Sequence, residues 1–204
     1  MLFVDKNGLV DAERIIVKRF STIERGKLDK INGIVVHQTD STTSGSVFNS
    51  YQNSGANGAH FLIDKDGTIY QTASLYKVAN HVVFLQSRCL LKKSCSPQEL
   101  KKSMDMDKIK NIREKSKTVH RYEASKDFPN RFPYNADSIG VEIVGKAERI
   151  KNEDVYEPVN DRQNESLKWL IKELSETLSI SLNEIYRHPD VGRKNATEAS
   201  TAKW

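Results

Sequence analysis

Two histidines that adjoin polar loops are the residues of this chain best suited to bind a metal ion. His37 directly follows three β-branched residues, 34–36, and the polar stretch 39–45 lies just beyond it. β-Branched residues favour a buried strand, and a strand that ends in a loop holds a side chain firmly beside solvent. The second histidine is His188, and charged residues follow it closely: Asp190, Arg193, Lys194 and Glu198. We interpret the two stretches as halves of one zinc site.

Composition alone does not select the ligands, because the chain has five histidines: His37, His60, His81, His120 and His188. The sequence contains no HExxH motif, which excludes the helix-borne metalloprotease pattern. It also has no Gly-rich phosphate loop and no GxSxG turn, so nucleotide binding and α/β-hydrolase chemistry lose support.

A carboxylate within an apolar strand is the next candidate for chemistry. Residues 138–144 alternate so that Ile139, Val141 and Ile143 share one face, with Glu142 on the other. A buried carboxylate without a partner is costly, so Glu142 either faces water or faces a functional site.

The elements that must position these residues indicate a single α/β domain over residues 1–204, with a mixed central sheet flanked by helices. Residues 1–32 form a lead-in with a short helical pattern over 12–20, and a second short helix is predicted over 46–53. Asp66-Gly67 between two apolar runs predicts a β-hairpin. An apolar stripe predicts a long helix over 164–178, with Asn164 as a possible cap.

Residues 85–134 are expected to be an insertion at the rim of the site. They are basic, with one helix predicted over 97–116 and a loop over 121–134, where two prolines interrupt any regular element. A solvated structural insert is favoured over a segment that gates or contacts substrate.

Bulk composition indicates a globular chain, with 37% hydrophobic and 29% charged residues. No apolar run reaches the roughly 20 residues of a membrane span. The net charge of +5 mildly favours polyanionic partners, but no motif supports nucleic-acid binding. Cys89 and Cys95 either close a small disulfide loop or stay free thiols.

Five short blocks occur in a family's order: IVVHQT at 34–39, GAHFLIDKDGTIYQ at 58–71, ANH at 79–81, NADSIGVE at 135–142 and HPDV at 188–191. In them the chain resembles the zinc-dependent N-acetylmuramoyl-L-alanine amidases, whose fold is shared with peptidoglycan recognition proteins and phage lysozyme-type amidases. The resemblance covers residues 31–84 and 134–204. It implies hydrolysis of the amide bond between N-acetylmuramic acid and L-alanine.

The resemblance implies zinc (Zn2+) held by two histidines and a third ligand, with one position open for water. Carried over, His37 and His188 are the histidine ligands. Relatives place an Asp or Cys eight or ten residues after the second histidine, and here those positions hold Ala196 and Glu198. Glu198 is therefore the expected third ligand, and Asp190 is the alternative.

The same resemblance implies roles for the neighbouring residues. Glu142 is at the position of the catalytic acid and base, and Lys194 is the cation expected to stabilise the oxyanion, with Arg193 as its substitute. Three polar residues fall near the substrate groove: Asn80 and His81 as substrate contacts, and His60 as a structural or substrate-binding residue. Tyr70 either lines the groove or packs in the core.

A non-catalytic peptidoglycan-binding module is the alternative, because recognition proteins that lose a metal ligand keep the fold. Residues 1–8 lack the features of a signal peptide. The expected settings are a phage lysin released by lysis, an antibacterial effector exported by another route, or a cytoplasmic recycling enzyme. The first two act on the cell wall in the periplasm of the host or target cell, and an effector implies a cognate immunity protein. The substrate is intact peptidoglycan or soluble muropeptides, and the chain is expected to be a monomer.

Overall fold

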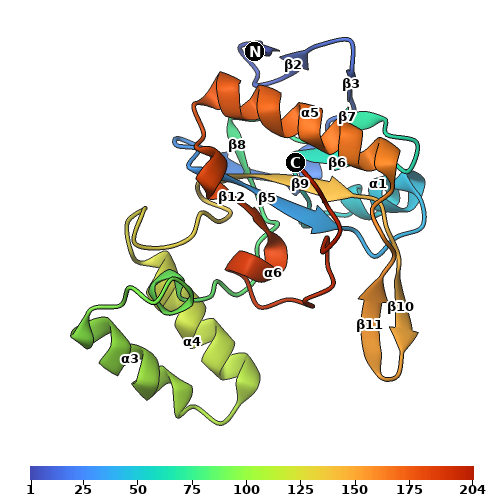
Figure 1. The fold of residues 1–204 in the computed structure, drawn as a ribbon. Helices are drawn as coiled ribbons and strands as arrows, with labels where there is room; N and C mark the ends of the chain where they lie inside the picture. Colours follow the sequence, from blue (N-terminus) through green and yellow to red (C-terminus); the bar gives the residue numbers. More distant parts are fainter.

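A six-stranded mixed sheet forms the centre of the computed structural model, which describes residues 1–204 (Figure 1). The strand order is β12-β5-β9-β6-β7-β3. The strands are β3 (Ile15–Val17), β5 (Gly33–Gln38), β6 (Phe61–Ile63), β7 (Ile69–Gln71), β9 (Ser138–Ile143) and β12 (Ile185–Arg187). All neighbouring strands are parallel except β6 and β7, whose antiparallel hairpin is the one predicted from Asp66-Gly67. The predicted α/β class with a mixed sheet is confirmed.

One face of the sheet packs against the long helix α5 (Asp161–Leu178), which crosses it in Figure 1. Alternate residues of β9, among them Ile139 and Val141, form the main core together with Leu167 and Leu170 of the helix. The helix begins three residues before the predicted start, because Asn160 rather than Asn164 provides the cap and accepts a hydrogen bond from the Gln163 N–H.

The opposite face is covered by separate, smaller clusters. Helix α1 (Ser44–Tyr51) packs Phe48 and Tyr51 near Leu62, and the predicted helix over 46–53 is thereby confirmed within two residues. A second cluster includes Val35, Val82 and several residues near α6 (His188–Val191). His37 lies on this same face, because it is two residues beyond Val35 along the strand.

The lead-in contains short strands instead of the predicted helix over 12–20. They are β1 (Phe3–Val4), β2 (Val10–Asp11) and β4 (Glu24–Lys27), together with β3; β4 pairs with β8 (Lys77–Ala79). The helix prediction was wrong because Ile15, Ile16 and Val17 are β-branched and find a partner in β7, which supplies the hydrogen bonds of an edge strand.

Residues 85–134 form three helices that project from the sheet (Figure 1): α2 (Arg88–Leu91), α3 (Pro97–Asp107) and α4 (Ile112–Ala124). The single predicted helix over 97–116 is wrong, and so is the predicted start of the loop at 121. The predicted helix is interrupted between α3 and α4. There the Asn111 side chain accepts a hydrogen bond from the Glu114 N–H and caps the start of a new helix. Cys89 and Cys95 form a disulfide.

A hairpin of β10 (Ala147–Ile150) and β11 (Glu153–Tyr156) projects on the side of α6 opposite to α3 and α4 (Figure 1). The helices α2–α4 and this hairpin therefore flank the loop that follows β12. No helix is both long and apolar enough to cross a membrane.

Candidate active site

Three parallel strands bring the residues of the site together. The register pairs Arg187 of β12 with Val36 of β5, and His37 of β5 with Glu142 of β9. Paired residues of parallel strands point to the same face, so His37 and Glu142 share the face opposite α5. The chain turns into α6 directly after Arg187, which places His188 beside His37.

His37, His188 and Glu198 form a buried cluster of metal-ligand type. One ligand atom from each residue lies within 4.8 Å of the others. The two histidine Nδ1 atoms are 2.9 Å apart, and Glu198 Oε1 lies 3.2 Å from His188 Nδ1 and 3.5 Å from His37 Nδ1. The structure thus brings together the three residues predicted as ligands.

The hydrogen bonds indicate where the protons of the cluster lie. The Val83 N–H donates to His188 Nε2 at 3.2 Å, so a neutral His188 carries its proton on Nδ1. That proton faces both His37 Nδ1 and Glu198 Oε1. Burial, followed by the nearby charge of His188, lowers the pKa of His37 to about 4, so the His37 ring is neutral at pH 7.

This arrangement fits a divalent metal ion. The second carboxylate oxygen of Glu198, Oε2, is buried and has no hydrogen-bond partner. Burial alone would raise the pKa of Glu198, but the neighbouring His188 and His37 outweigh it and hold the pKa well below its usual range. A buried carboxylate with a spare oxygen beside two imidazole nitrogens is a donor set that suits zinc.

His81 lies next to the cluster formed by His37, His188 and Glu198, and it is buried. Its Nδ1 is 3.0 Å from His37 Nε2, and its Nε2 lies 3.2 Å from Ser138 Oγ. Asn135 fixes the backbone of this residue by accepting the His81 N–H. The His81 ring thus contacts His37 and Ser138, and the role of His81 as a substrate contact stays a prediction.

His60 is fully buried, and both ring nitrogens are bound by the main chain. Nδ1 accepts the Gly140 N–H at 3.0 Å, and Nε2 donates to the carbonyl oxygen of Lys77 at 2.9 Å. These contacts favour the structural role of His60, and its role in substrate binding stays a prediction. Tyr70 packs edge-on against the ring of Phe48. Asn80 is half-buried, and its role as a substrate contact stays a prediction.

Glu142 is hydrogen-bonded by a residue that was not predicted from the sequence. The hydroxyl of Tyr51, on α1, donates to Glu142 Oε2 at 2.7 Å. Burial raises the pKa of Glu142, this hydrogen bond opposes the rise, and the charge of Glu198 adds to it. In the sequence, Tyr51 is only a member of an apolar helix face; no local signal links it to a strand ninety residues later.

The charged residues after His188 separate in the structure. Lys194 Nζ lies 4.0 Å from Glu198 Oε2, beside the cluster and partly exposed. Arg193 instead donates to Ser116 Oγ of α4 at 2.9 Å, away from the cluster, so its prediction as a substitute for Lys194 is corrected. Asp190 accepts the Arg187 N–H at the start of α6 and lies outside the cluster.

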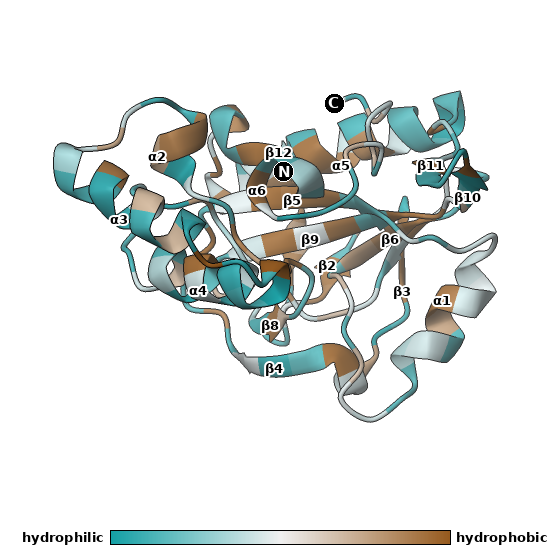
Figure 2. Cartoon of the chain, turned by 90° about the horizontal axis from the view of Figure 1, so that it is seen from below, coloured by the Kyte–Doolittle hydropathy of each residue, from teal (hydrophilic) through white to brown (hydrophobic).

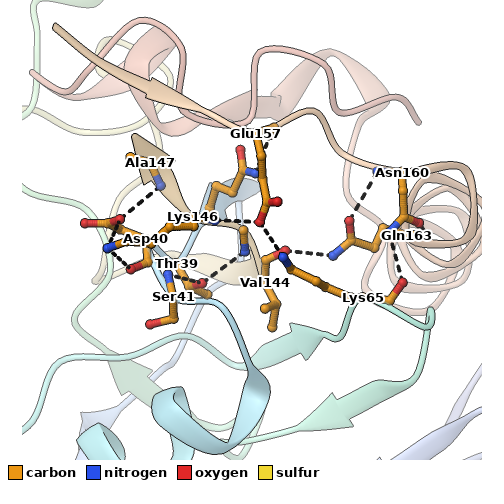
Figure 3. Close-up of polar contacts among 12 residues, drawn as sticks. Thr39, Asp40, Ser41, Lys65, Val144, Lys146, Ala147, Glu157, Asn160 and Gln163 are labelled. Atoms are coloured by element: carbon orange, nitrogen blue, oxygen red, sulfur yellow. Dashed lines mark hydrogen bonds and ion pairs between the residues drawn. The ribbon is translucent and has the colours of Figure 1, made fainter. Parts of the chain in front are cut away.

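The loop after His37 is fixed by polar contacts to the base of the β10–β11 hairpin (Figure 3). Asp40 Oδ1 pairs with Lys146 Nζ at 2.9 Å and accepts the Ala147 N–H at 3.0 Å. The hairpin also holds the loop of Glu198, because the carbonyl of Asp154 accepts hydrogen bonds from Asn195 and Thr197. Both loops that border the cluster are thus tied to one hairpin.

Comparison with known proteins gives one family and one fold. A family model described as N-acetylmuramoyl-L-alanine amidase matches residues 27–199. No curated protein matches the chain.

Several solved structures share the fold. The selenomethionine AmpD derivative is 15% identical, with 95% of this chain and 89% of that chain covered and a TM-score of 0.54. The endolysin N-acetylmuramoyl-L-alanine amidase LysCS from Clostridium intestinale URNW is 18% identical, with coverages of 90% and 86% and a TM-score of 0.50. PlyL is 14% identical, with coverages of 88% and 84% and a TM-score of 0.50.

Proposed function

This chain belongs to the N-acetylmuramoyl-L-alanine amidase family, and from that premise we propose that it is a zinc-dependent enzyme. Its reaction is hydrolysis of the amide bond between the lactyl group of N-acetylmuramic acid and the L-alanine of peptidoglycan. The observation that carries the zinc dependence is the buried cluster of His37, His188 and Glu198, in which one carboxylate oxygen has no hydrogen-bond partner, beside Glu142.

His37 would hold the ion through a ring nitrogen, and His188 and Glu198 would be the other two ligands. When bound, zinc supplies Lewis acidity, lowering the pKa of water towards about 7 and polarising the scissile carbonyl. The three residues are all buried, so the protein would shield them from bulk water.

Glu142 is the proposed general base and acid. It takes the proton of the attacking water and passes it to the nitrogen of L-alanine, which leaves as a free amine. Its pKa is raised toward neutral pH, and a group with a pKa near the working pH both accepts and donates a proton effectively. Tyr51 fixes Oε2, so the other oxygen of Glu142 is left to accept the proton.

Lys194 is the proposed partner of the oxyanion. Its ammonium group lies at the edge of the cluster and its side chain is 41% exposed, so it can move toward a negative charge that develops on the carbonyl oxygen. No other lysine or arginine pairs with Glu198.

The bond that is cut can be identified by digesting purified peptidoglycan and analysing the products by mass spectrometry. Wild type is expected to release stem peptides with a free L-alanine amine, and a zinc chelator is expected to stop the release. Glu142→Gln keeps the size of the side chain but cannot accept the proton, so we expect a loss of about 10²- to 10⁴-fold in kcat with zinc still bound. Sugar products without free peptides would refute the amidase proposal.

A binding module without catalysis remains the second candidate, because Ala196 occupies one of the two positions where relatives carry the third ligand. It would be supported if zinc-loaded wild type were retained on purified wall without cutting it. The geometry of Glu198 favours the enzyme.

The setting we propose is outside the reducing cytoplasm, as a phage lysin or an exported antibacterial effector rather than a recycling enzyme. The Cys89–Cys95 disulfide supports this, because such bonds persist mainly in oxidising compartments. The proposal predicts that the chain lyses a Gram-negative cell when directed to the periplasm and spares the same cell when kept in the cytoplasm. Equal growth in both cases, with full expression, would contradict it.

A further inference from the structure

The positive charge of the chain is concentrated in the segment 85–134, which carries α2, α3 and α4. This segment holds thirteen of the 32 lysines and arginines but only six of the 27 aspartates and glutamates. Its net charge of +7 exceeds the +5 of the whole chain, so the rest of the protein is slightly acidic. The basic character noted in the sequence is therefore a local property of this projecting segment.

Most of these cations have no carboxylate partner. The acidic residues of α3 and α4 pair with Lys108, Lys115 and Lys126, and Arg88 pairs with Glu184 of the body. The exposed cations of the segment that form no ion pair are Lys92, Lys93, Lys101, Lys102, Lys110, Arg113, Lys117 and Arg121. A solvated structural face usually mixes both signs, so this excess points to an anionic partner.

Large hydrophobic side chains are exposed among the same cations. They are Leu90, Leu91, Leu100, Met104 and Ile112, with exposed fractions between 44% and 60%. Figure 2 shows hydrophobic stretches of α2 and α3 next to hydrophilic ones on this segment. Leu90, Leu100 and Met104 also line an open groove of about 360 Å³ between the helices. Apolar patches of this kind mark interaction sites.

At three places a cationic residue directly follows an exposed apolar one: Lys92 follows Leu91, Lys101 follows Leu100, and Arg113 follows Ile112. Long cationic side chains can lie along an apolar surface and keep their charge in the polar layer above it. Exposed leucines interspersed with lysines on short helices are typical of segments that lie in a membrane interface.

We propose that α2, α3 and α4 form a docking surface for an anionic lipid membrane. The exposed leucines and Met104 would enter the boundary between headgroups and acyl chains, and the eight unpaired cations would lie among the phosphates. A wall polyanion would match the charge but would gain nothing from the apolar side chains, which is why lipid is favoured. The Cys89–Cys95 disulfide holds Leu90 and Leu91 of α2 in place relative to α3. The proposal does not depend on the amidase activity.

The test is sedimentation of the full chain with vesicles of phosphatidylcholine alone or with one third phosphatidylglycerol, in 0.1 M salt. We expect binding only to the anionic vesicles. Lys101→Gln with Lys102→Gln should weaken it about tenfold or more. Leu100→Ser with Met104→Ser, which leaves every charge in place, should weaken it to a similar degree.

The matched control removes two exposed, unpaired lysines of α5, Lys168→Gln with Lys172→Gln, and should leave binding unchanged. Far-UV circular dichroism before and after heating checks that each variant folds. No binding to anionic vesicles overturns the proposal. Retention on purified wall instead of vesicles, or full binding by the Leu100 and Met104 variant, would also overturn it in favour of a surface for polyanions.

Discussion

His81 shows how one side chain can determine which nitrogen of another binds metal. His37 places Nε2 against His81 Nδ1, and His81 Nε2 faces Ser138. If His81 Nε2–H donates to Ser138, its Nδ1 accepts the proton of His37 Nε2, and the lone pair of His37 Nδ1 is left for the metal ion. The tautomer of His37 thus follows from a residue that does not touch the ion.

We expect His81→Phe to weaken zinc binding by about 10- to 100-fold, because phenylalanine fills similar space but accepts no proton from His37. Competition with a chromogenic chelator measures the affinity. His120→Phe is the control, because His120 lies outside the cluster. Unchanged affinity in His81→Phe would mean that packing alone orients His37.

Tyr51→Phe is expected to move the acidic limb of the kcat/KM profile to higher pH. The base must be a carboxylate, and the Tyr51 hydroxyl stabilises that form; without it the pKa of Glu142 rises further, so activity is lost at a higher pH on acidification. A pH series with a soluble muropeptide measures the limb. An acidic limb that does not move would show that the pKa of Glu142 does not set the pH dependence of the rate.

At the residue scale, the sequence led to Glu142 and to a cluster that the structure assembles from His37, His188 and Glu198, because each lies in or next to a recognisable block. The neighbours of those residues were beyond its reach. Tyr51 and Glu142 are 91 positions apart, and the orientation of the His81 ring depends on packing that no local pattern encodes.

At the scale of elements, the site depends on β5, β9 and β12, whose parallel register aligns the residues at their ends. The three-residue strand β12 was not predicted. β5, β9 and α5 were predictable because each buries an apolar face. The lead-in was not, since its β-branched residues fit a weak helical period and an edge strand equally. The break between α3 and α4 was missed because the Asn111 cap interrupts a helix without proline or glycine.

Gly140 allows β9 to pass close to the His81 ring, and Gly140→Ala tests that approach. A Cβ atom there would lie 2.7 Å from His81 Cγ, and the ring is held on both sides. We expect a loss of about 1–3 kcal/mol in the free energy of unfolding, together with weaker zinc binding. Gly26→Ala in β4 is the control, since nothing lies within 4 Å of its Cβ position. Equal stability of the two variants in urea would show that the ring moves aside freely.

At the scale of the whole molecule, buried neutral histidines make folding sensitive to acid. Burial lowers the pKa of His60 to about 4, whereas an unfolded histidine titrates near 6.5. The unfolded chain therefore binds a proton first, and the stability from this group, present above pH 6.5, is lost as the pH falls to 4, by roughly 3 kcal/mol.

Urea unfolding of protein treated with a metal chelator, at a series of pH values from 7 to 4, measures this loss. His60→Gln should be less stable at pH 7 but should lose less stability on acidification than wild type. His120→Gln, which changes a more exposed ring, should keep most of the wild-type dependence. The same dependence in His60→Gln as in wild type would show that other groups dominate.

The central claim is that His37, His188 and Glu198 hold the zinc ion on which the amidase depends. The most direct measurement is to strip the enzyme of metal, titrate zinc back, and follow the release of free L-alanine amines from peptidoglycan in wild type and in Glu198→Ala. We predict that wild-type activity returns at one zinc per chain, while the variant stays inactive at that ratio and binds zinc far more weakly. Full recovery of Glu198→Ala at one zinc per chain, or wild-type activity that survives stripping, would contradict the claim.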